Sequence, residues 1–218
     1  MDLRMKRTRK MLRDALWEAI MEKGFEGLTV SEVCERAMIN RATFYRHYED
    51  INDLLLRGID EVFDEIYALG EPAYPPEKLA QYELTGPPRN FILFINFVGE
   101  RADFFRLMLS DRGIPAFITR LRAYVEELIL ERIHVSLRRD STPLVPLELI
   151  ARGWAGQIMG MLIWWLEKGQ KITAENMAIY LTAVVFHTIY ECLDMDIPVV
   201  SFDLKAALRE INEHFYNG

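Results

Sequence analysis

Hydrophobic residues recur along most of the chain with the period of an α-helix. In the first such segment Leu12, Ala15, Leu16, Ala19 and Ile20 follow this period, and Gly24 ends it. No stretch alternates polar and apolar residues for long enough to predict a strand. The pattern therefore predicts an all-α fold of about nine to ten helices, with later helices at about 50–69, 88–100, 103–110, 114–139, 146–168, 173–194 and 203–216.

Two short helices joined by a tight turn are expected between residues 29 and 48. Thr29 and Glu32 have the spacing of a capping box at the start of the first of these helices. A break follows at Met38, and Asn40 is a good N-cap for the second helix. The second helix is rich in Arg, Thr, Tyr and His, so the pair is a candidate helix-turn-helix whose second member enters a DNA major groove.

Charge is distributed unevenly between the two ends of the chain. The 218 residues carry a net charge of −7, but residues 1–48 hold 10 Lys/Arg against 7 Asp/Glu, while residues 49–218 hold 16 against 26. A basic N-terminal part followed by an acidic remainder is the charge distribution expected when only one end of the chain binds phosphate. The basic run from Arg4 to Arg13 either tracks the DNA backbone or is a solvated tail.

Composition narrows the class of protein further. Half of the residues are hydrophobic and 27% are charged, which predicts packed globular domains. Two distant cysteines and the absence of an apolar leader favour a cytoplasmic protein. The longest uncharged runs have 14 and 15 residues, short of the roughly 18 that a membrane span needs, so no membrane partner is expected. A segment at 70–88, which holds five of the nine prolines, is expected to be a loop.

The stretches from Gly24 to Ser31 and from Phe44 to Asp50 resemble the N-terminal domain of TetR-type transcriptional regulators. The resemblance covers about residues 8–57 and includes Thr-Phe-Tyr-Arg-His-Tyr at 43–48. Residues 101–110 are similar to a C-terminal type found in many members. The resemblance implies a helix-turn-helix DNA-binding domain at 1–50 and a helical regulatory and dimerisation domain at 51–218.

By this resemblance, DNA contacts are expected from the second helix and from the start of the helix before it. Arg41 lies early enough to reach a base edge, whereas Phe44 and Tyr48 are expected in the core. The candidate DNA-binding residues are Thr29, Ser31, Asn40, Arg41, Ala42, Thr43, Tyr45, Arg46 and His47.

Two residues depart from the family pattern. Met38 stands where the turn usually has glycine, which suggests a turn conformation that tolerates a side chain. Ile51 stands where members usually carry a lysine that holds phosphate. Together the two departures are expected to weaken operator affinity.

The body is rich in aromatic residues and methionine, which either form plain core or line a pocket for an apolar small molecule. The candidate ligand-binding residues are Phe63, Phe94, Phe105, Tyr124 and Met159. Helices 146–168 and 173–194 are apolar around much of their girth, so pairing with a second copy as a four-helix bundle is expected. The candidate dimer-interface residues are Leu162, Trp165, Tyr180, Val184 and His187.

The sequence therefore favours a homodimeric transcriptional regulator that binds near-palindromic double-stranded operator DNA and responds to a small-molecule effector. The resemblance favours a repressor. A regulator without such an effector, controlled by a protein partner, stays open. An all-α enzyme is a further alternative, although no catalytic motif is present. The scattered His and Cys residues predict no metal site, and no cofactor is expected.

Overall fold

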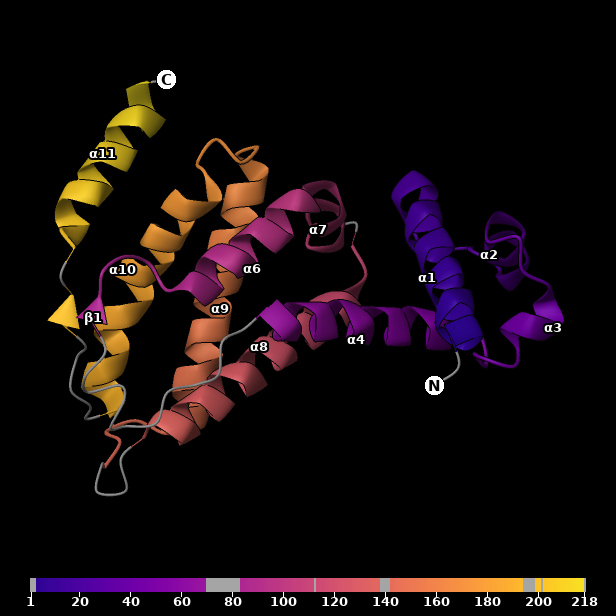
Figure 1. Cartoon of the computed structure of the whole chain (residues 1–218), viewed down its shortest axis with the longest axis horizontal. Coiled ribbons are helices and arrows are strands. Elements are labelled where there is room, and N and C mark those ends of the chain that lie inside the picture. Colours follow the sequence, from indigo (N-terminus) through magenta and orange to yellow (C-terminus); the bar gives the residue numbers. More distant parts are fainter. Residues whose placement is uncertain are drawn as a thin grey trace. The chain divides into compact units, whose positions relative to one another are not determined.

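The computed structural model describes residues 3–69, 83–111, 113–137, 142–193, 199–200 and 202–217, and it confirms the all-α fold. In this part of the chain there are ten helices (Figure 1). Their bounds are α1 Leu3–Lys23, α2 Val30–Arg36, α3 Arg41–Phe44, α4 Ile51–Leu69, α6 Arg89–Glu100, α7 Ala102–Met108, α8 Pro115–Ser136, α9 Leu147–Glu167, α10 Ala174–Leu193 and α11 Leu204–Asn217.

The helices from α4 onward lie where the hydrophobic period predicted them, within about three residues at each end. Two short strands were not predicted: β1 (Glu83–Leu84) pairs in parallel with β2 (Val199–Val200). A two-residue strand is too short to show alternation, and its partner lies more than a hundred residues away in the sequence. The expected loop at 70–88 lies outside the described residues up to position 82, and β1 occupies part of the remainder.

The chain divides into two compact units, which are Met1–Glu65 with Leu107–Arg120 and Ile66–Arg106 with Leu121–Gly218. These units are defined by packing, and the division at residue 50 into a DNA-binding and a regulatory domain remains a prediction about function. The first unit contains the expected helix-turn-helix segment. Its core side chains are almost fully buried and include Leu12, Leu16, Ile20, Val33, Phe44, Leu54, Ile59 and Phe117.

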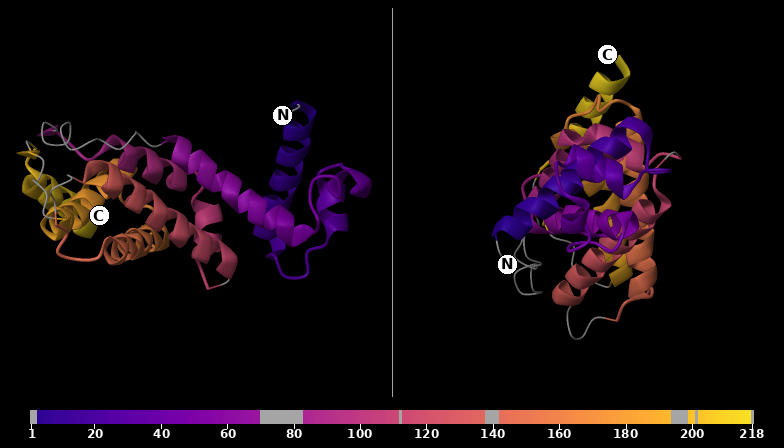
Figure 2. Two further views of the ribbon diagram at one scale, coloured as in Figure 1. Left: turned by 90° about the horizontal axis from the view of Figure 1, so that it is seen from below. Right: turned by 90° about the vertical axis from the view of Figure 1, so that its right-hand side faces the viewer.

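Two side-chain hydrogen bonds hold the start of helix α4. The Asp50 carboxylate accepts a hydrogen bond from the backbone N–H of Asp53 at 2.8 Å, and the Asp53 carboxylate accepts one from the N–H of Glu49 at 3.0 Å. Both bonds satisfy backbone donors that have no partner within a helix. Asp50 thus caps α4, which continues as one helix to Leu69 (Figure 2).

In the second unit α10 packs against both α6 and α9. The indole N–H of Trp165 donates to the carbonyl oxygen of Ile172 at 2.8 Å, which ties the end of α9 to the turn before α10. The Gln170 side chain donates to the carbonyl oxygen of Gly99 at 3.1 Å and so connects that turn to α6. The unit is closed by α11, which packs on α10 (Figure 1).

Two of the predicted dimer-interface residues are buried inside the second unit. Leu162 is 1% exposed and Trp165 is 2% exposed, so neither side chain is available to a second copy. The opposite, outward side of α9 carries Gly153, Gly156 and Gly160, around which there is open space. None of the described helices is long and apolar enough to cross a membrane.

Candidate nucleic-acid interface

The first helix of the helix-turn-helix is held by the predicted capping box. The Thr29 hydroxyl accepts a hydrogen bond from the backbone N–H of Glu32 at 3.3 Å. The Glu32 carboxylate in turn accepts one from the Thr29 backbone N–H at 2.9 Å, and it also pairs with Lys23 at the end of α1. The hydrogen bond from Lys23 and those from Thr29 lower the pKa of Glu32 to about 2. This carboxylate therefore joins the end of α1 to the start of α2.

The turn between α2 and α3 retains the backbone geometry that usually selects glycine. Met38 has φ 53°, in the left-handed region, and its side chain is 86% exposed. The backbone N–H of Met38 donates to Glu35 at 3.1 Å, and that of Ile39 donates to Cys34 at 2.9 Å, which fixes the turn. The prediction that the turn has a conformation suited to a side chain was therefore wrong. These hydrogen bonds hold Met38 in the left-handed conformation, which a residue with a side chain disfavours.

The second helix, α3, starts at the predicted cap. The Asn40 side-chain oxygen accepts a hydrogen bond from the N–H of Ala42 at 2.8 Å. The α-helix ends at Phe44, earlier than expected, but the N–H groups of His47 and Tyr48 still donate to the Phe44 carbonyl oxygen. Phe44 and Tyr48 are 0% and 3% exposed, so the prediction that they belong to the core is confirmed.

The opposite side of α3 and its final turn is exposed. Arg41, Ala42, Tyr45 and Arg46 are exposed there, and Tyr45 keeps 58% of its surface accessible. Polar side chains along this face are positioned by one another: Arg41 donates to the Ser31 hydroxyl, and Arg46 donates to the Thr43 hydroxyl at 3.1 Å. The structure thus places Ser31, Arg41, Thr43, Tyr45 and Arg46 on one polar surface.

His47 completes this surface from a half-buried position. Burial lowers the pKa of His47 below its ordinary value of 6.5, and the positive charges of Arg9 and Arg46 lower it further. The imidazole is therefore neutral near pH 7 and retains one donor and one acceptor nitrogen. The sequence did not indicate that Arg9, from α1, would lie close enough to His47 to affect its charge, because this proximity depends on how α1 packs.

The basic run at the start of the chain is helical and is not an extended tail, since α1 begins at Leu3. One member of the run is turned inward: Arg13 pairs with Glu61 at 2.8 Å and with Glu65 at 3.3 Å, both on α4. These ion pairs help to hold α1 against α4. Lys10 pairs with Asp14 one turn further along α1.

The predicted ligand-binding residues are distributed over both units. Phe63 belongs to the first unit, where it packs against Phe117 with ring centroids 6.0 Å apart. The other four belong to the second unit: Phe105 and Met159 are buried, whereas Phe94 and Tyr124 are half-buried. Within the residues that the structure describes, no three His, Cys, Asp or Glu side chains gather as metal ligands would.

Of the remaining predicted dimer contacts, Tyr180 and Val184 lie on α10. Tyr180 is half-buried, and its hydroxyl donates to the Asn212 side chain on α11 at 2.5 Å. Val184 is 41% exposed. The side chain of His187 lies outside the described residues.

A capped helix, a tight turn and a second helix with a polar exposed face define a helix-turn-helix DNA-binding protein. The family comparisons agree. Residues 12–57 match the model described as bacterial regulatory proteins, tetR family, and residues 87–187 match one described as transcriptional regulator C-terminal region. The chain belongs to the TetR family of transcriptional regulators, whose members bind operator DNA and act as dimers.

Individual relatives are distant. An uncharacterized HTH-type transcriptional regulator, YxbF, from Bacillus subtilis (strain 168) is 23% identical over 185 residues, which are 81% of this chain and 44% of the relative. The matched part of the chain thus spans less than half of that relative's length.

Solved structures share the fold at low identity. A TetR transcriptional regulator from Streptococcus agalactiae 2603V has a TM-score of 0.60 at 22% identity, over 84% of this chain and 95% of the other. The dihydroxyacetone kinase operon activator DhaS has a TM-score of 0.59 at 17% identity, over 85% and 98% of the two chains.

We predict that Met38→Gly stabilises the protein. A left-handed backbone costs a residue with a side chain about 1–2 kcal/mol, and glycine avoids this but loses about 0.5–1 kcal/mol more conformational entropy on folding. The free energy of unfolding should therefore rise by about 0.5–1 kcal/mol, as measured by urea denaturation. Met38→Ala is the matched control, because it shortens the exposed side chain but keeps Cβ. Equal stability of the two variants would contradict the argument.

We also predict that Glu32→Gln reduces the sensitivity of folding to acid. The pKa of Glu32 is lowered from 4.5 to about 2, so its carboxylate stabilises the fold above pH 4.5 and loses this effect as pH falls towards 2. The urea midpoint of the variant should be lower at pH 7 but should fall less steeply between pH 5 and pH 2. Glu35→Gln, on the same helix, should behave as wild type; a wild-type slope for Glu32→Gln would refute the prediction.

Proposed function

We propose that this protein is a repressor that binds a near-palindromic operator as a homodimer and releases it when a small molecule binds the helical domain. The exposed face of Arg41, Tyr45 and Arg46, held by the buried Phe44 on the other side of the same helix, is the observation that carries the DNA-binding part. One solved structure of this fold is described as an operon activator, so the fold itself is compatible with either direction of regulation.

In this proposal Arg41 reads a base edge, and Ser31 acts mainly by orienting it, because the Ser31 hydroxyl accepts a hydrogen bond from the Arg41 guanidinium. A bidentate contact between arginine and guanine discriminates between bases by about 1–3 kcal/mol. Arg46 reaches either a base or a phosphate. The Ala42 methyl group suits contact with a thymine methyl group, and Asn40 lies at the exposed start of the helix.

Phosphate contacts are proposed for Thr43, Tyr45 and His47, and for Thr29 at the N-terminus of α2. Such contacts position a protein on DNA and make its affinity depend on salt. Ile51 provides no charge at the start of α4, so the protein has one fewer phosphate contact per protomer than members that carry lysine there. Because the chromosome lies in the cytoplasm of a bacterium, we propose that the protein acts there.

For the homodimer we propose the outward side of α9, together with α10. This side of α9 has no side chains at Gly153, Gly156 and Gly160, so the backbone of a second helix can approach closely. Val184 contributes an exposed apolar side chain from α10. A two-fold dimer presents two copies of α3 to successive major grooves, about 34–36 Å apart, and therefore selects a near-palindrome.

For the effector we propose a mainly apolar small molecule held in the second unit by Phe94 and Tyr124, which are half-buried. Phe105 and Met159 would form the wall behind them, whereas Phe63 belongs to the first unit. A ligand that favours the arrangement unable to bind DNA by about 1–3 kcal/mol would change operator affinity about 5–150-fold. Control by a protein partner without any effector is the alternative, and an all-α enzyme is a weaker one.

The first test is selection of bound sites from random double-stranded DNA at two salt concentrations. A near-palindrome should be enriched, and Arg41→Ala should lower affinity for it about 5–150-fold for each half-site, since one base contact is lost from each. Arg41 is exposed, so the variant should keep its stability. Arg122→Ala makes the same change at an exposed position on α8 and should bind as wild type. Weak binding with no enriched sequence would overturn the proposal.

The dimer interface is tested by Gly156→Arg. There is open space around Gly156, so an arginine fits the single chain and improves helix propensity, but it would prevent close approach of a second helix. In sedimentation experiments the variant should be monomeric at concentrations where wild type is dimeric. Gly86→Arg, at another glycine with open surroundings, is the control. A Gly156→Arg variant that dimerises normally would show that the interface lies elsewhere.

A further inference from the structure

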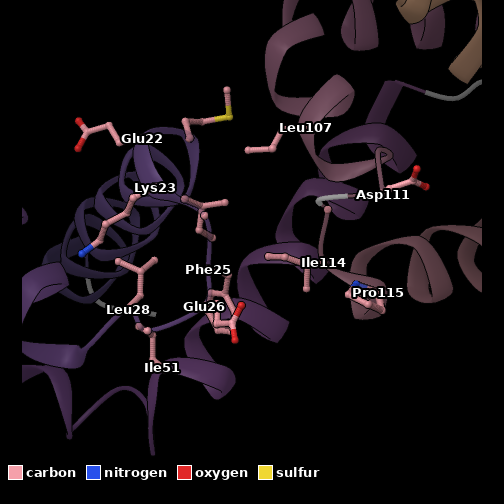
Figure 3. A pocket seen from close by; sticks show the side chains of 15 residues that line it. Glu22, Lys23, Phe25, Glu26, Leu28, Ile51, Leu107, Asp111, Ile114 and Pro115 are labelled. Carbon is pink, nitrogen blue, oxygen red and sulfur yellow. The ribbon is translucent and has the colours of Figure 1, made fainter.

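A groove with a volume of about 960 Å³ lies within the first unit. One wall is formed by the end of α1 and the loop that follows it, residues 20–28. The other is formed by Leu107 at the end of α7, by Asp111 and Gly113 after it, and by Ile114 and Pro115 at the start of α8. Ile51 lies at the base of the first wall (Figure 3). This volume is in the range of pockets that hold ligands of about drug size.

Much of the groove lining is apolar. Phe25 and Ile51 contribute from the first wall, and Leu107, Ile114 and Pro115 contribute from the second (Figure 3). Phe25, Ile51 and Leu107 are only half-buried, so part of their apolar surface is open to the groove. Covering such surface with the apolar part of a ligand is favourable by about 25 cal/mol per Å².

Four charged residues line the groove, and the two whose charges are neutralised lie on α1. Glu22 accepts a hydrogen bond from Arg36 at 2.8 Å, and Lys23 pairs with Glu32. Glu26 on the first wall and Asp111 on the second are exposed, and neither has an ion pair in the described part of the chain. Among the described residues, the carboxylates of Glu26 and Asp111 thus bring negative charge to the groove that no ion pair neutralises.

Ile51 contributes to this imbalance. A lysine at this position would bring a positive charge to the same wall as Glu26. With isoleucine the position adds apolar surface to the groove instead. The combination of apolar walls and unneutralised carboxylates is complementary to an amphipathic cation.

We propose that this groove binds an amphipathic organic cation, a molecule with an apolar body and an ammonium or similar positive group. The apolar body contacts Phe25, Ile51 and Ile114, and the positive group lies near Glu26 or Asp111. This site is separate from the effector site proposed in the second unit. It uses residues of the first unit alone.

Binding at this site affects the DNA-binding surface through a short path. Residues 24–28, which line the groove, lead directly to Thr29, the N-cap of α2. Lys23, at the groove, holds the Glu32 carboxylate of the capping box. A ligand that displaces this loop therefore disturbs the start of α2, where Ser31 orients Arg41. This consequence for DNA rests on the proposed function, whereas the binding itself does not.

The test is calorimetric titration of the full chain with octyltrimethylammonium, 1-octanol and octanoate, which have similar apolar chains and differ in charge. The cation should bind about 2- to 30-fold more tightly than the neutral alcohol, as expected for two exposed carboxylates, and the anion more weakly than either. Equal affinity for the cation and the alcohol, or no binding of the cation, would overturn the proposal.

Two variants test whether the cation binds in this groove. Glu26→Gln combined with Asp111→Asn keeps the shape of both side chains and should reduce the affinity for the cation to that for the alcohol. Ile51→Lys should weaken cation binding as well, by adding a positive charge to the groove. Glu35→Gln combined with Asp64→Asn removes the same number of charges at exposed positions outside the groove and should leave cation binding unchanged. An undiminished affinity in the groove variants would show that the cation binds elsewhere.

The effect on DNA is measured separately, with the operator found by selection. If the cation binds the groove, it should lower operator affinity in wild type and leave it unchanged in the Glu26→Gln, Asp111→Asn variant. An operator that binds normally and is insensitive to a groove-bound cation would refute the coupling and leave the proposed function intact. Absence of any operator would refute the proposed function, while the calorimetric result would still decide the site.

Discussion

The position of the recognition helix depends on the burial of Phe44. The α-helical part of α3 has only four residues, and a helix this short has no stability of its own. Its orientation is therefore imposed by the core of the first unit, through Phe44 and through Tyr48, whose rings lie 5.6 Å apart. Because these two side chains are buried, Arg41, Tyr45 and Arg46 must face outward. One hydrophobic contact thus decides which polar groups are presented to DNA.

The same unit uses charged residues for two different purposes. Arg13 and Lys23 are engaged with carboxylates of α4 and α2, so they contribute to packing of the helices. Arg41 and Arg46 hydrogen-bond to hydroxyl groups, which orient a guanidinium without neutralising its charge. A charge that is held in place but not neutralised is the arrangement suited to binding phosphate or a base edge. Counting basic residues alone does not separate these roles.

The two departures from the family pattern have different physical effects. Met38 affects stability, because it occupies a left-handed turn residue that a side chain disfavours, and its exposed side chain gains little packing in return. Ile51 affects charge, because it leaves the start of α4 without a cation and adds apolar surface beside Glu26. Met38 thus affects the turn of the helix-turn-helix, whereas Ile51 affects both DNA binding and the groove that it lines.

The sequence by itself determined the all-α fold, most helix bounds and the caps at Thr29 and Asn40, because these depend on local period and local hydrogen bonds. It also indicated Phe44 and Tyr48 as core residues. Tertiary structure alone decided that Leu162 and Trp165 are internal, that β1 pairs with β2, and that Arg9 lies near His47. It also decided that residues 20–28 line one groove with Leu107, Asp111, Gly113, Ile114 and Pro115. Each of these depends on residues distant in the chain coming together, and the one-dimensional pattern of polar and apolar positions does not specify which distant surfaces meet.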